Sequence, residues 1–303
     1  MDLEIVKFIQ SGANEFFDVF FSLITRFGEE IFFVCLFLIF YWVVSYNYAF
    51  KFALFYLASV LINNVLKIIV KRPRPWMASD LVDNKLPATG MSFPSGHSQG
   101  IACISTFIVY DCYKYKPFKK GVNITILVSL IVLSLLVGFS RIYLGQHYLT
   151  DVIAGLILGV LVILLVNFIY SKISNKFKSK FNLEATLAFL SLVLMVAVVV
   201  VSLTDFISYE TALKVFKYAG MLIGTTLGYM LSKRLVEEIN ETMLAKLVKV
   251  IVGLIVVFGL IILFGLIPET QFVVGMSVLI VAFVATFVYP YVFSLIYKKI
   301  KKA

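Results

Sequence analysis

Two histidines attract attention because they are scarce and lie in polar stretches of an apolar chain. His97 and His147 are the only histidines among 303 residues. Asp151 follows His147 by four residues, about one helical turn, so its carboxylate can reach one imidazole nitrogen. A carboxylate in that place fixes the tautomer, stabilises an imidazolium and leaves the other nitrogen free to attack an electrophile. The alternative is a polar network at a helix end, without a chemical role.

Cations suited to an anionic ligand lie near these residues. Lys67 and Arg74 are seven residues apart, about two helical turns, so they would share one face if the helix continued. Pro73 and Pro75 indicate instead that the helix ends there. Arg141 comes shortly before the second histidine, and its planar guanidinium can bind phosphate oxygens in pairs. Anchoring in the lipid head-group layer is the alternative role for the first two cations.

The stretch FPSGHSQG, residues 93–100, has the features of a helix start. Pro94 and Gly96 shape a turn, and Ser95 can cap the helix that follows. His97 would then lie in the first turn, where unpaired backbone N–H groups and the positive end of the helix dipole suit a phosphate. The alternative is a capped helix with a hydrogen-bonded histidine at the membrane interface.

The elements that must position these residues are membrane helices. Hydrophobic residues make up 61% of the chain and the mean hydropathy is +0.99, which excludes a large soluble globule. We predict an all-α, polytopic membrane bundle of about nine transmembrane helices, because apolar runs of about 20 residues recur. An interfacial helix is expected at about residues 14–27, with an extra span as the alternative. The expected spans are 30–46, 50–70, 97–114, 121–142, 149–171, 184–203, 211–231, 247–266 and 271–294.

Lysine-rich loops predict the orientation of these helices. The lysine-rich segments are 114–120, 172–180, the stretch with Lys233 and Arg234, and the tail 298–303. Nine spans place all of them on one side, which the positive-inside rule assigns to the cytoplasm together with the C-terminus. The loops 71–97 and 140–147, which carry the candidate chemistry, then face outside. Their arginines break the charge rule, so they need another explanation.

Composition also limits the expected partners and cofactors. The net charge is +10, but the basic residues lie in short loops between apolar runs, so we expect anionic lipid head groups and no nucleic acid as partners. Cys35, Cys103 and Cys112 are far apart and give neither a metal-binding spacing nor a disulfide framework. We expect no metal and no cofactor. The first residues do not have the pattern of a cleavable signal peptide, and the Lys-, Ile-, Phe- and Asn-rich composition favours a bacterial cell membrane.

The chain divides by chemistry into two parts. Residues 1–171 hold both histidines and the polar motifs, and residues 172–303 add nearly pure apolar helices of unknown role. Small residues at helical spacing let helices pack closely in lipid. They are Gly155 with Gly159, and Gly220 with Gly224 and Gly228. We favour packing within the chain over packing between chains, and a homo-oligomer stays open.

Taken together, these spacings resemble the three-part signature of the type 2 phosphatidic acid phosphatase (PAP2) superfamily. The resemblance covers roughly residues 5–171 and implies an α-helical bundle with an externally facing, metal-independent phosphatase site. It implies His147 as the nucleophile, Asp151 as its orienting partner and His97 as the acid for the leaving group. The residues that it implies as phosphate ligands are Lys67, Arg74, Ser95, Gly96 and Arg141.

The expected reaction is hydrolysis of a lipid phosphate or an isoprenoid diphosphate through a phosphohistidine. Phosphatidate, phosphatidylglycerophosphate and undecaprenyl diphosphate are the types considered. A soluble sugar phosphate is an alternative, because the superfamily includes a nine-span branch that acts on glucose 6-phosphate. A lipid-phosphate transporter or flippase with a PAP2-like binding site is the alternative from another class. The C-terminal helices depart from the smaller bacterial members, which leaves the substrate open.

Overall fold

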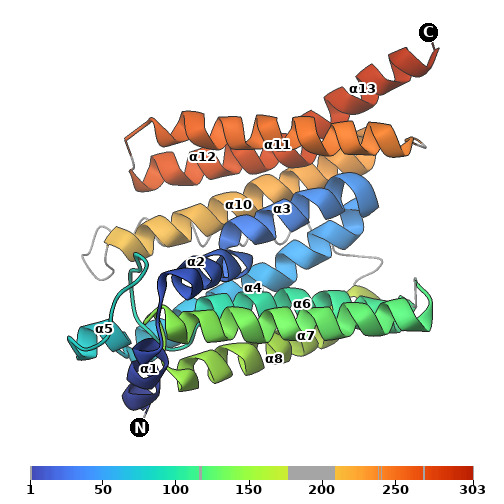
Figure 1. Cartoon of the computed structure of the whole chain (residues 1–303). Coiled ribbons are helices and arrows are strands. Elements are labelled where there is room, and N and C mark those ends of the chain that lie inside the picture. The colour runs from blue at the N-terminus through green and yellow to red at the C-terminus, as the bar shows by residue number, and fades with distance from the viewer. Residues whose placement is uncertain are drawn as a thin grey trace. The chain divides into compact units, whose positions relative to one another are not determined.

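The computed structural model describes residues 2–115, 118–176, 209–237, 239, 241–268 and 270–302. Within these ranges the chain consists of helices joined by turns and loops, with no strand, as expected for an all-α protein (Figure 1). The chain divides into two compact units. Unit 1 comprises Met1–Val34 and Phe52–Ser171, and unit 2 comprises Cys35–Lys51 and Lys172–Ala303. Both histidines therefore belong to unit 1.

The helices of unit 1 begin and end at recognisable local signals. The side chain of Asn14 accepts a hydrogen bond from the backbone N–H of Phe17 and so caps α2. Lys71 takes a left-handed φ of 50° directly after α4, and Pro73 then prevents further helix. The elements are α1 (Asp2–Ser11), α2 (Glu15–Ile24), the 3-10 turn η1 (Thr25–Gly28), α3 (Glu30–Ile39), α4 (Tyr46–Val70), α5 (Pro75–Ala78), α6 (Gly96–Tyr115), α7 (Lys120–Tyr143) and α8 (Leu149–Lys176). Helix α3 ends in unit 2, and α4 begins there.

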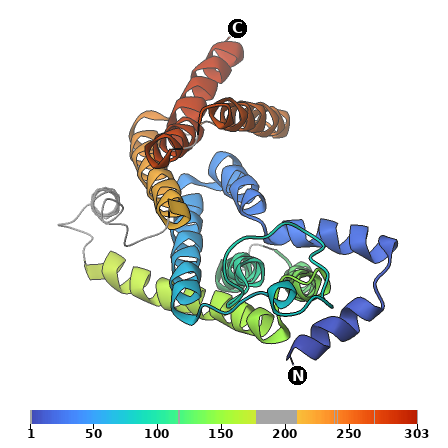
Figure 2. The same cartoon turned by 90° about the vertical axis from the view of Figure 1, so that its left-hand side faces the viewer.

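Two glycines allow α8 to lie directly against the beginning of α6. A Cβ atom at Gly155 would lie 2.5 Å from the carbonyl oxygen of Ser95, and one at Gly159 would lie 2.5 Å from that of Gln99. No larger residue fits such an approach without moving a backbone. The expected close packing of this glycine pair within the chain is confirmed. It brings together the beginnings of the two helices, where the backbone N–H of Ser95 donates to the carbonyl of Asp151. The course of α6 and α8 can be followed in Figure 2.

The described part of unit 2 consists of packed apolar helices. A Cβ atom at Gly220 would overlap the carbonyl of Gly275, and one at Gly224 would overlap that of Leu279. This glycine face therefore packs within the chain, as expected. The elements that complete unit 2 are the π-helical turn η2 (Phe40–Val44), α10 (Tyr209–Leu235), α11 (Met243–Gly265), α12 (Gln271–Phe283), the π-helical turn η3 (Val284–Val288) and α13 (Tyr289–Lys302).

The described residues contain fewer clear membrane spans than the nine predicted. Five helices are long and apolar enough to cross a bilayer: Tyr46–Ala78, Lys120–Tyr143, Leu149–Ile169, Met243–Gly265 and Gln271–Lys301. The pair Glu15–Gly28 and Glu30–Val44, bent by 52°, would make a sixth if it is one broken span. This pair includes the predicted interfacial helix, whose placement on the membrane surface stays a prediction.

Three of the nine expected spans are not among these six candidates: 97–114, 184–203 and 211–231. The expected spans 97–114 and 211–231 are present as α6 and α10. The first turns of α6 carry polar candidate site residues, and α10 carries lysines and threonines. These residues lower the mean hydropathy of both helices. The expected span 184–203 lies outside the described residues, and so does most of the lysine-rich segment 172–180. The count of nine stays a prediction.

Replacing Gly224 by leucine should destabilise the protein. The larger side chain would push α10 away from the backbone of α12 at Leu279, and overpacking of this kind costs about 1–3 kcal/mol. We expect a lower midpoint of thermal unfolding in detergent for Gly224→Leu. Gly259→Leu is the matched control, because a Cβ atom at Gly259 meets nothing within 4 Å. Equal midpoints for the two variants would contradict the packing described here.

Candidate active site

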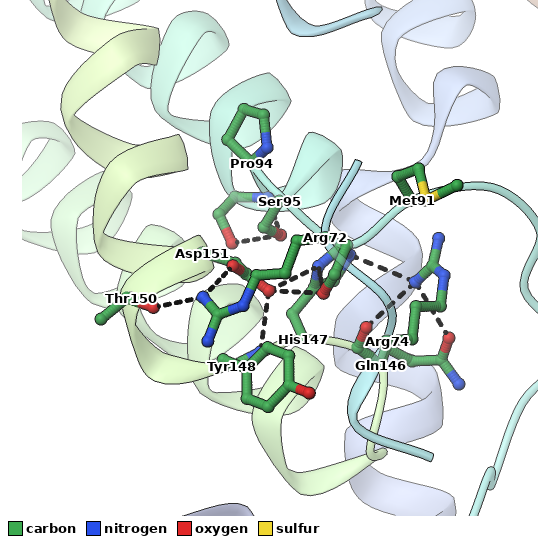
Figure 3. A network of polar contacts seen from close by, with 12 residues as sticks. Arg72, Arg74, Met91, Pro94, Ser95, Gln146, His147, Tyr148, Thr150 and Asp151 are labelled. Carbon is green, nitrogen blue, oxygen red and sulfur yellow. Dashed lines mark hydrogen bonds and ion pairs between the residues drawn. The ribbon is translucent and has the colours of Figure 1, made fainter. Parts of the chain in front are cut away.

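The candidate residues converge at one end of unit 1, where α4 and α7 end and α6 and α8 begin. Figure 3 shows Arg74, Ser95, His147 and Asp151 from this group. His147 lies in the short turn between α7 and α8, and its side chain is only 2% exposed. The backbone N–H of His147 donates to the carbonyl of Arg141, which fixes the turn on the end of α7. The backbone N–H of Ser95 donates to the carbonyl of Asp151 at 3.0 Å, which joins the beginnings of α6 and α8. Residues far apart in the sequence therefore share one small volume.

The carboxylate of Asp151 is fully buried and hydrogen-bonded at both oxygens. Its Oδ1 accepts from Nη1 of Arg72 at 2.8 Å. Its Oδ2 accepts from Oγ of Ser92 at 2.5 Å and from the backbone N–H of Tyr148 at 3.0 Å. The distance from Oδ2 to Nδ1 of His147 is 3.6 Å, which is longer than a hydrogen bond. The structure brings His147 and Asp151 together as predicted, but each side chain lies closer to the hydroxyl of Ser92 than to the other.

Arg74 lies on the opposite side of the imidazole from Asp151. Its Nη1 is 3.5 Å from Nε2 of His147 and donates to the carbonyl of Gln146 at 3.0 Å. The guanidinium also donates to the carbonyls of Gly90 at 2.9 Å and Thr89 at 2.7 Å. The side chain is nearly buried, and these contacts fix the plane of the guanidinium beside the ring (Figure 3). Nε2, the nitrogen remote from Asp151, therefore faces a permanent cation.

Lys67 and Arg141 approach the site from the ends of α4 and α7. Nζ of Lys67 donates to the carbonyl of Met91 at 2.6 Å and contacts that of Ser92 at 3.4 Å. Arg141 is 5% exposed, and its Nη1 donates to Oγ1 of Thr25 at 2.7 Å. Nε of Arg141 has no hydrogen-bond partner among the described residues. A buried N–H group without an acceptor costs free energy unless a ligand accepts its hydrogen bond, and an anion is a suitable acceptor.

Gly96 and His97 lie in the first turn of α6, as the sequence predicts, and Ser95 directly precedes this turn. Oγ of Ser95 accepts from the hydroxyl of Ser98 at 2.8 Å and from its backbone N–H at 3.4 Å. The turn η1 covers His97 closely, because a Cβ atom at Gly28 would lie 2.8 Å from Cβ of His97. The expected helix start is therefore present, with Ser95 in the capping role.

The environment of His147 favours a neutral imidazole. Burial lowers the pKa of this side chain well below its ordinary value of 6.5, and the charges of Arg141, Lys67 and Arg74 lower it further. A neutral imidazole keeps one nitrogen lone pair, which is what a nucleophile or a base requires. The same cations would attract an anion to the ring.

Sequence reasoning missed Arg72, whose side chain binds Asp151 directly. Its Nη1 reaches Oγ1 of Thr150 at 2.7 Å as well as Asp151, and its Nη2 donates to Asp2 in α1 at 2.8 Å. The guanidinium carbon lies 3.8 Å from the ring centroid of Tyr148. The one signal in the sequence was the excess of arginine in a loop predicted to face outside, where the charge rule expects few.

Other residues that the sequence did not single out support the site from behind. Asn63 in α4 donates to Oε1 of Gln99 in α6 at 2.8 Å, and Gln99 donates to Oγ of Ser59 at 2.9 Å. Gln146 donates to the carbonyl of Leu86 at 2.7 Å. These side chains are buried amides, whose pairing across helices leaves no periodic signal. Among the described residues, no three His, Cys, Asp or Glu side chains lie close enough together to hold a metal ion.

The region that holds these residues matches a known protein family. The model of the PAP2 superfamily matches residues 48–175, and the model of the PAP2 superfamily phosphatase transmembrane extension matches residues 216–301. A solved structure of a transmembrane PAP2 type phosphatidylglycerolphosphate phosphatase from Bacillus subtilis is similar, with 29% identity and a TM-score of 0.50. The similarity covers 60% of this chain and 87% of that chain.

Curated relatives match over shorter stretches. Phosphatidylglycerophosphatase B of Bacillus subtilis is 39% identical over 98 residues, which are 32% of this chain and 46% of that protein. Undecaprenyl-diphosphatase BcrC of the same organism is 33% identical over 34% of this chain and 47% of its own length. Dolichyldiphosphatase of Saccharomyces cerevisiae is 34% identical over 33% of this chain and 42% of its own length. The chain thus spans less than half the length of these relatives.

Together, the two family models match more than half of the chain, on either side of residues 176–215. The first model includes the histidine site, and the second includes α11, α12 and α13. The resemblance expected from the signature spacings is confirmed, and the apolar helices are those of a membrane protein. The chain is a multi-pass membrane protein that belongs to the PAP2 superfamily.

Proposed function

We propose that this protein hydrolyses the phosphate or diphosphate group of a membrane lipid. The observation that carries the proposal is the buried imidazole of His147, with Asp151 behind Nδ1 and Arg74 in front of Nε2. Relatives whose names are phosphatidylglycerophosphatase, undecaprenyl-diphosphatase and dolichyldiphosphatase support a lipid phosphate as the substrate class. A lipid also fits a site at the end of membrane helices, because its tail stays in the bilayer while its head group reaches the cations.

In the proposed reaction, His147 acts as the nucleophile. Its Nε2 attacks phosphorus in line, and the bond from phosphorus to the leaving oxygen breaks as the new P–N bond forms. His97 donates a proton to the leaving oxygen. It then takes a proton from water, whose oxygen attacks phosphorus and breaks the P–N bond. The products are the dephosphorylated lipid, or the lipid monophosphate from a diphosphate, and inorganic phosphate.

The remaining residues stabilise charge in this proposal. Asp151 holds the imidazole and stabilises its positive charge after attack. Arg74, Arg141 and Lys67 neutralise the equatorial phosphate oxygens, where charge is concentrated in the transition state. Ser95 and Gly96 add the N-terminal end of α6, whose dipole favours an anion.

The proposed topology follows from the positive-inside rule. The site then faces the outside of the cell, and the C-terminus lies in the cytoplasm. In this proposal, residues 172–303 serve lipid access, packing or regulation, and residues 1–171 carry the chemistry.

Purified protein should release phosphate from lipid phosphates in the presence of a chelator. The assay should include phosphatidate, phosphatidylglycerophosphate, undecaprenyl diphosphate and, as a soluble comparison, glucose 6-phosphate. We expect turnover of at least one lipid with chelator present, because histidine and arginine side chains supply the nucleophile and the charge stabilisation. Turnover of glucose 6-phosphate alone would contradict a lipid substrate. Loss of turnover with chelator, restored by a divalent ion, would contradict the mechanism.

Replacing each of the two histidines should affect a different step of the reaction. His147→Ala should abolish turnover and phosphoenzyme formation, because it removes the attacking nitrogen. His97→Ala should slow turnover by about 10²–10⁴-fold, and a substrate with an activated leaving group should regain part of the loss. Trapping of acid-labile phosphoenzyme from labelled substrate measures the first step directly. Phosphoenzyme on the His147→Ala protein would place the nucleophile elsewhere.

Single cysteines should report the proposed orientation. In a variant without Cys35, Cys103 and Cys112, a cysteine in the loop 71–97 should react with an impermeant reagent on intact cells. A cysteine in the segment 114–120 should react only after the cells are opened. The opposite pattern would invert the topology.

A further inference from the structure

The hydroxyl of Ser92 lies between the carboxylate and the imidazole of the site. Oγ of Ser92 is 2.5 Å from Oδ2 of Asp151 and 3.3 Å from Nδ1 of His147. The direct distance from Oδ2 to Nδ1 is longer, at 3.6 Å. All three side chains are almost inaccessible to solvent, so no bulk water replaces these contacts.

Counting protons assigns the direction of each hydrogen bond. A serine hydroxyl has one hydrogen. Because the carboxylate oxygen at 2.5 Å can only accept, Ser92 donates that hydrogen to Oδ2 of Asp151. The hydroxyl therefore offers only lone pairs to Nδ1 of His147, and Nδ1 must carry a hydrogen to bond with it.

The other side of the ring gives the same assignment independently. Nη1 of Arg74 lies 3.5 Å from Nε2 of His147. A guanidinium has donors and no acceptor, and it stays protonated in proteins. An Nε2–H group would point a hydrogen at this donor, whereas a lone pair on Nε2 is compatible with it.

We propose that Ser92 is a positioning residue that holds neutral His147 in the tautomer with hydrogen on Nδ1 and the lone pair on Nε2. In this arrangement Asp151 acts on His147 through the serine hydroxyl. The inference deepens the proposed function, because that function requires a free lone pair on Nε2. It assigns to Ser92 the fixing of the tautomer, which the spacing of His147 and Asp151 alone attributes to the carboxylate.

The position of Ser92 is itself fixed by the two neighbouring cations. Its backbone N–H donates to the carbonyl of Arg72 at 2.8 Å, and its carbonyl is 3.4 Å from Nζ of Lys67. The guanidinium of Arg72 binds Oδ1 of Asp151. Arg72 therefore holds the serine backbone with its carbonyl and the aspartate with its side chain. This closed ring of contacts leaves the hydroxyl little freedom to turn away.

Nitrogen NMR of the imidazole tests the tautomer without any turnover. The chain has two histidines, so a His97→Gln protein labelled with ¹⁵N-histidine reports His147 alone. We expect a protonated Nδ1 and an unprotonated Nε2 at neutral pH in this background. Adding Ser92→Ala should give a mixture in which a fraction of the other tautomer appears, because the buried Nδ1–H loses its acceptor while Arg74 still favours a lone pair on Nε2. A hydrogen on Nε2 in the background protein, or an unchanged single tautomer after Ser92→Ala, would overturn the proposal.

Kinetics of the otherwise unmodified protein provide the second measurement. Ser92→Ala should lower kcat roughly tenfold or more with little change in KM, since one buried hydrogen bond to the nucleophile is lost. Ser105→Ala is the control, because Ser105 is also a buried serine of unit 1, and its hydroxyl pairs with that of Ser134 at 3.0 Å. Equal effects of the two substitutions on kcat would overturn the positioning role.

A second substitution covers the case in which Ser92→Ala does not fold. Ser92→Cys keeps a side chain of similar size but replaces the hydroxyl by a weak hydrogen-bonding group. It should give the same mixture of tautomers in the NMR experiment, and an unchanged tautomer would again overturn the proposal. If the unmodified protein hydrolyses no compound of the panel, the proposed function fails, whereas the NMR result still decides the role of Ser92.

Discussion

The structure of unit 1 depends on one buried negative charge, the carboxylate of Asp151. A carboxylate without solvent contact is tolerated only when it is paired and hydrogen-bonded, because its desolvation costs several kcal/mol. Arg72, Ser92 and the backbone of Tyr148 meet this demand from three different segments. The hydrogen bonds to this carboxylate therefore also fix the loop after α4, the loop before α6 and the turn before α8. The site and the local fold share the same constraint.

Helix packing places these segments within reach of one another. Gly155 lets α8 approach the carbonyl of Ser95, and the backbone N–H of Ser95 then reaches the carbonyl of Asp151. A side chain at Gly155 would separate the two helix starts and with them the aspartate and the first turn of α6. In a bilayer, where no hydrophobic force drives helices together, small residues supply this close contact. Glycine spacing within the membrane and the geometry of the polar site are therefore linked.

The part of the site that the sequence predicts is the part with local spacing. His147 and Asp151 are one helical turn apart, and the helix starting at Gly96 carries recognisable turn and capping residues. Ser92 and Arg72 meet Asp151 across 59 and 79 residues of chain, so no periodicity indicates them. The helix positions follow from apolar runs, and α6, α7 and α8 begin close to the expected residues. The number of membrane spans is harder to predict from the sequence, because polar residues of the candidate site lower the hydropathy of helices such as α6.

The hydrogen bonds of Arg74 have a consequence for ligand affinity. Its guanidinium already donates to the carbonyls of Thr89, Gly90 and Gln146, so these oxygens act as internal competitors of any incoming anion. The free energy of anion binding is then the difference between two sets of hydrogen bonds rather than the full strength of one set. Such a difference favours a moderate affinity for inorganic phosphate. In the proposed reaction, the guanidinium would donate to these carbonyls again once phosphate leaves, which would weaken inhibition by the product.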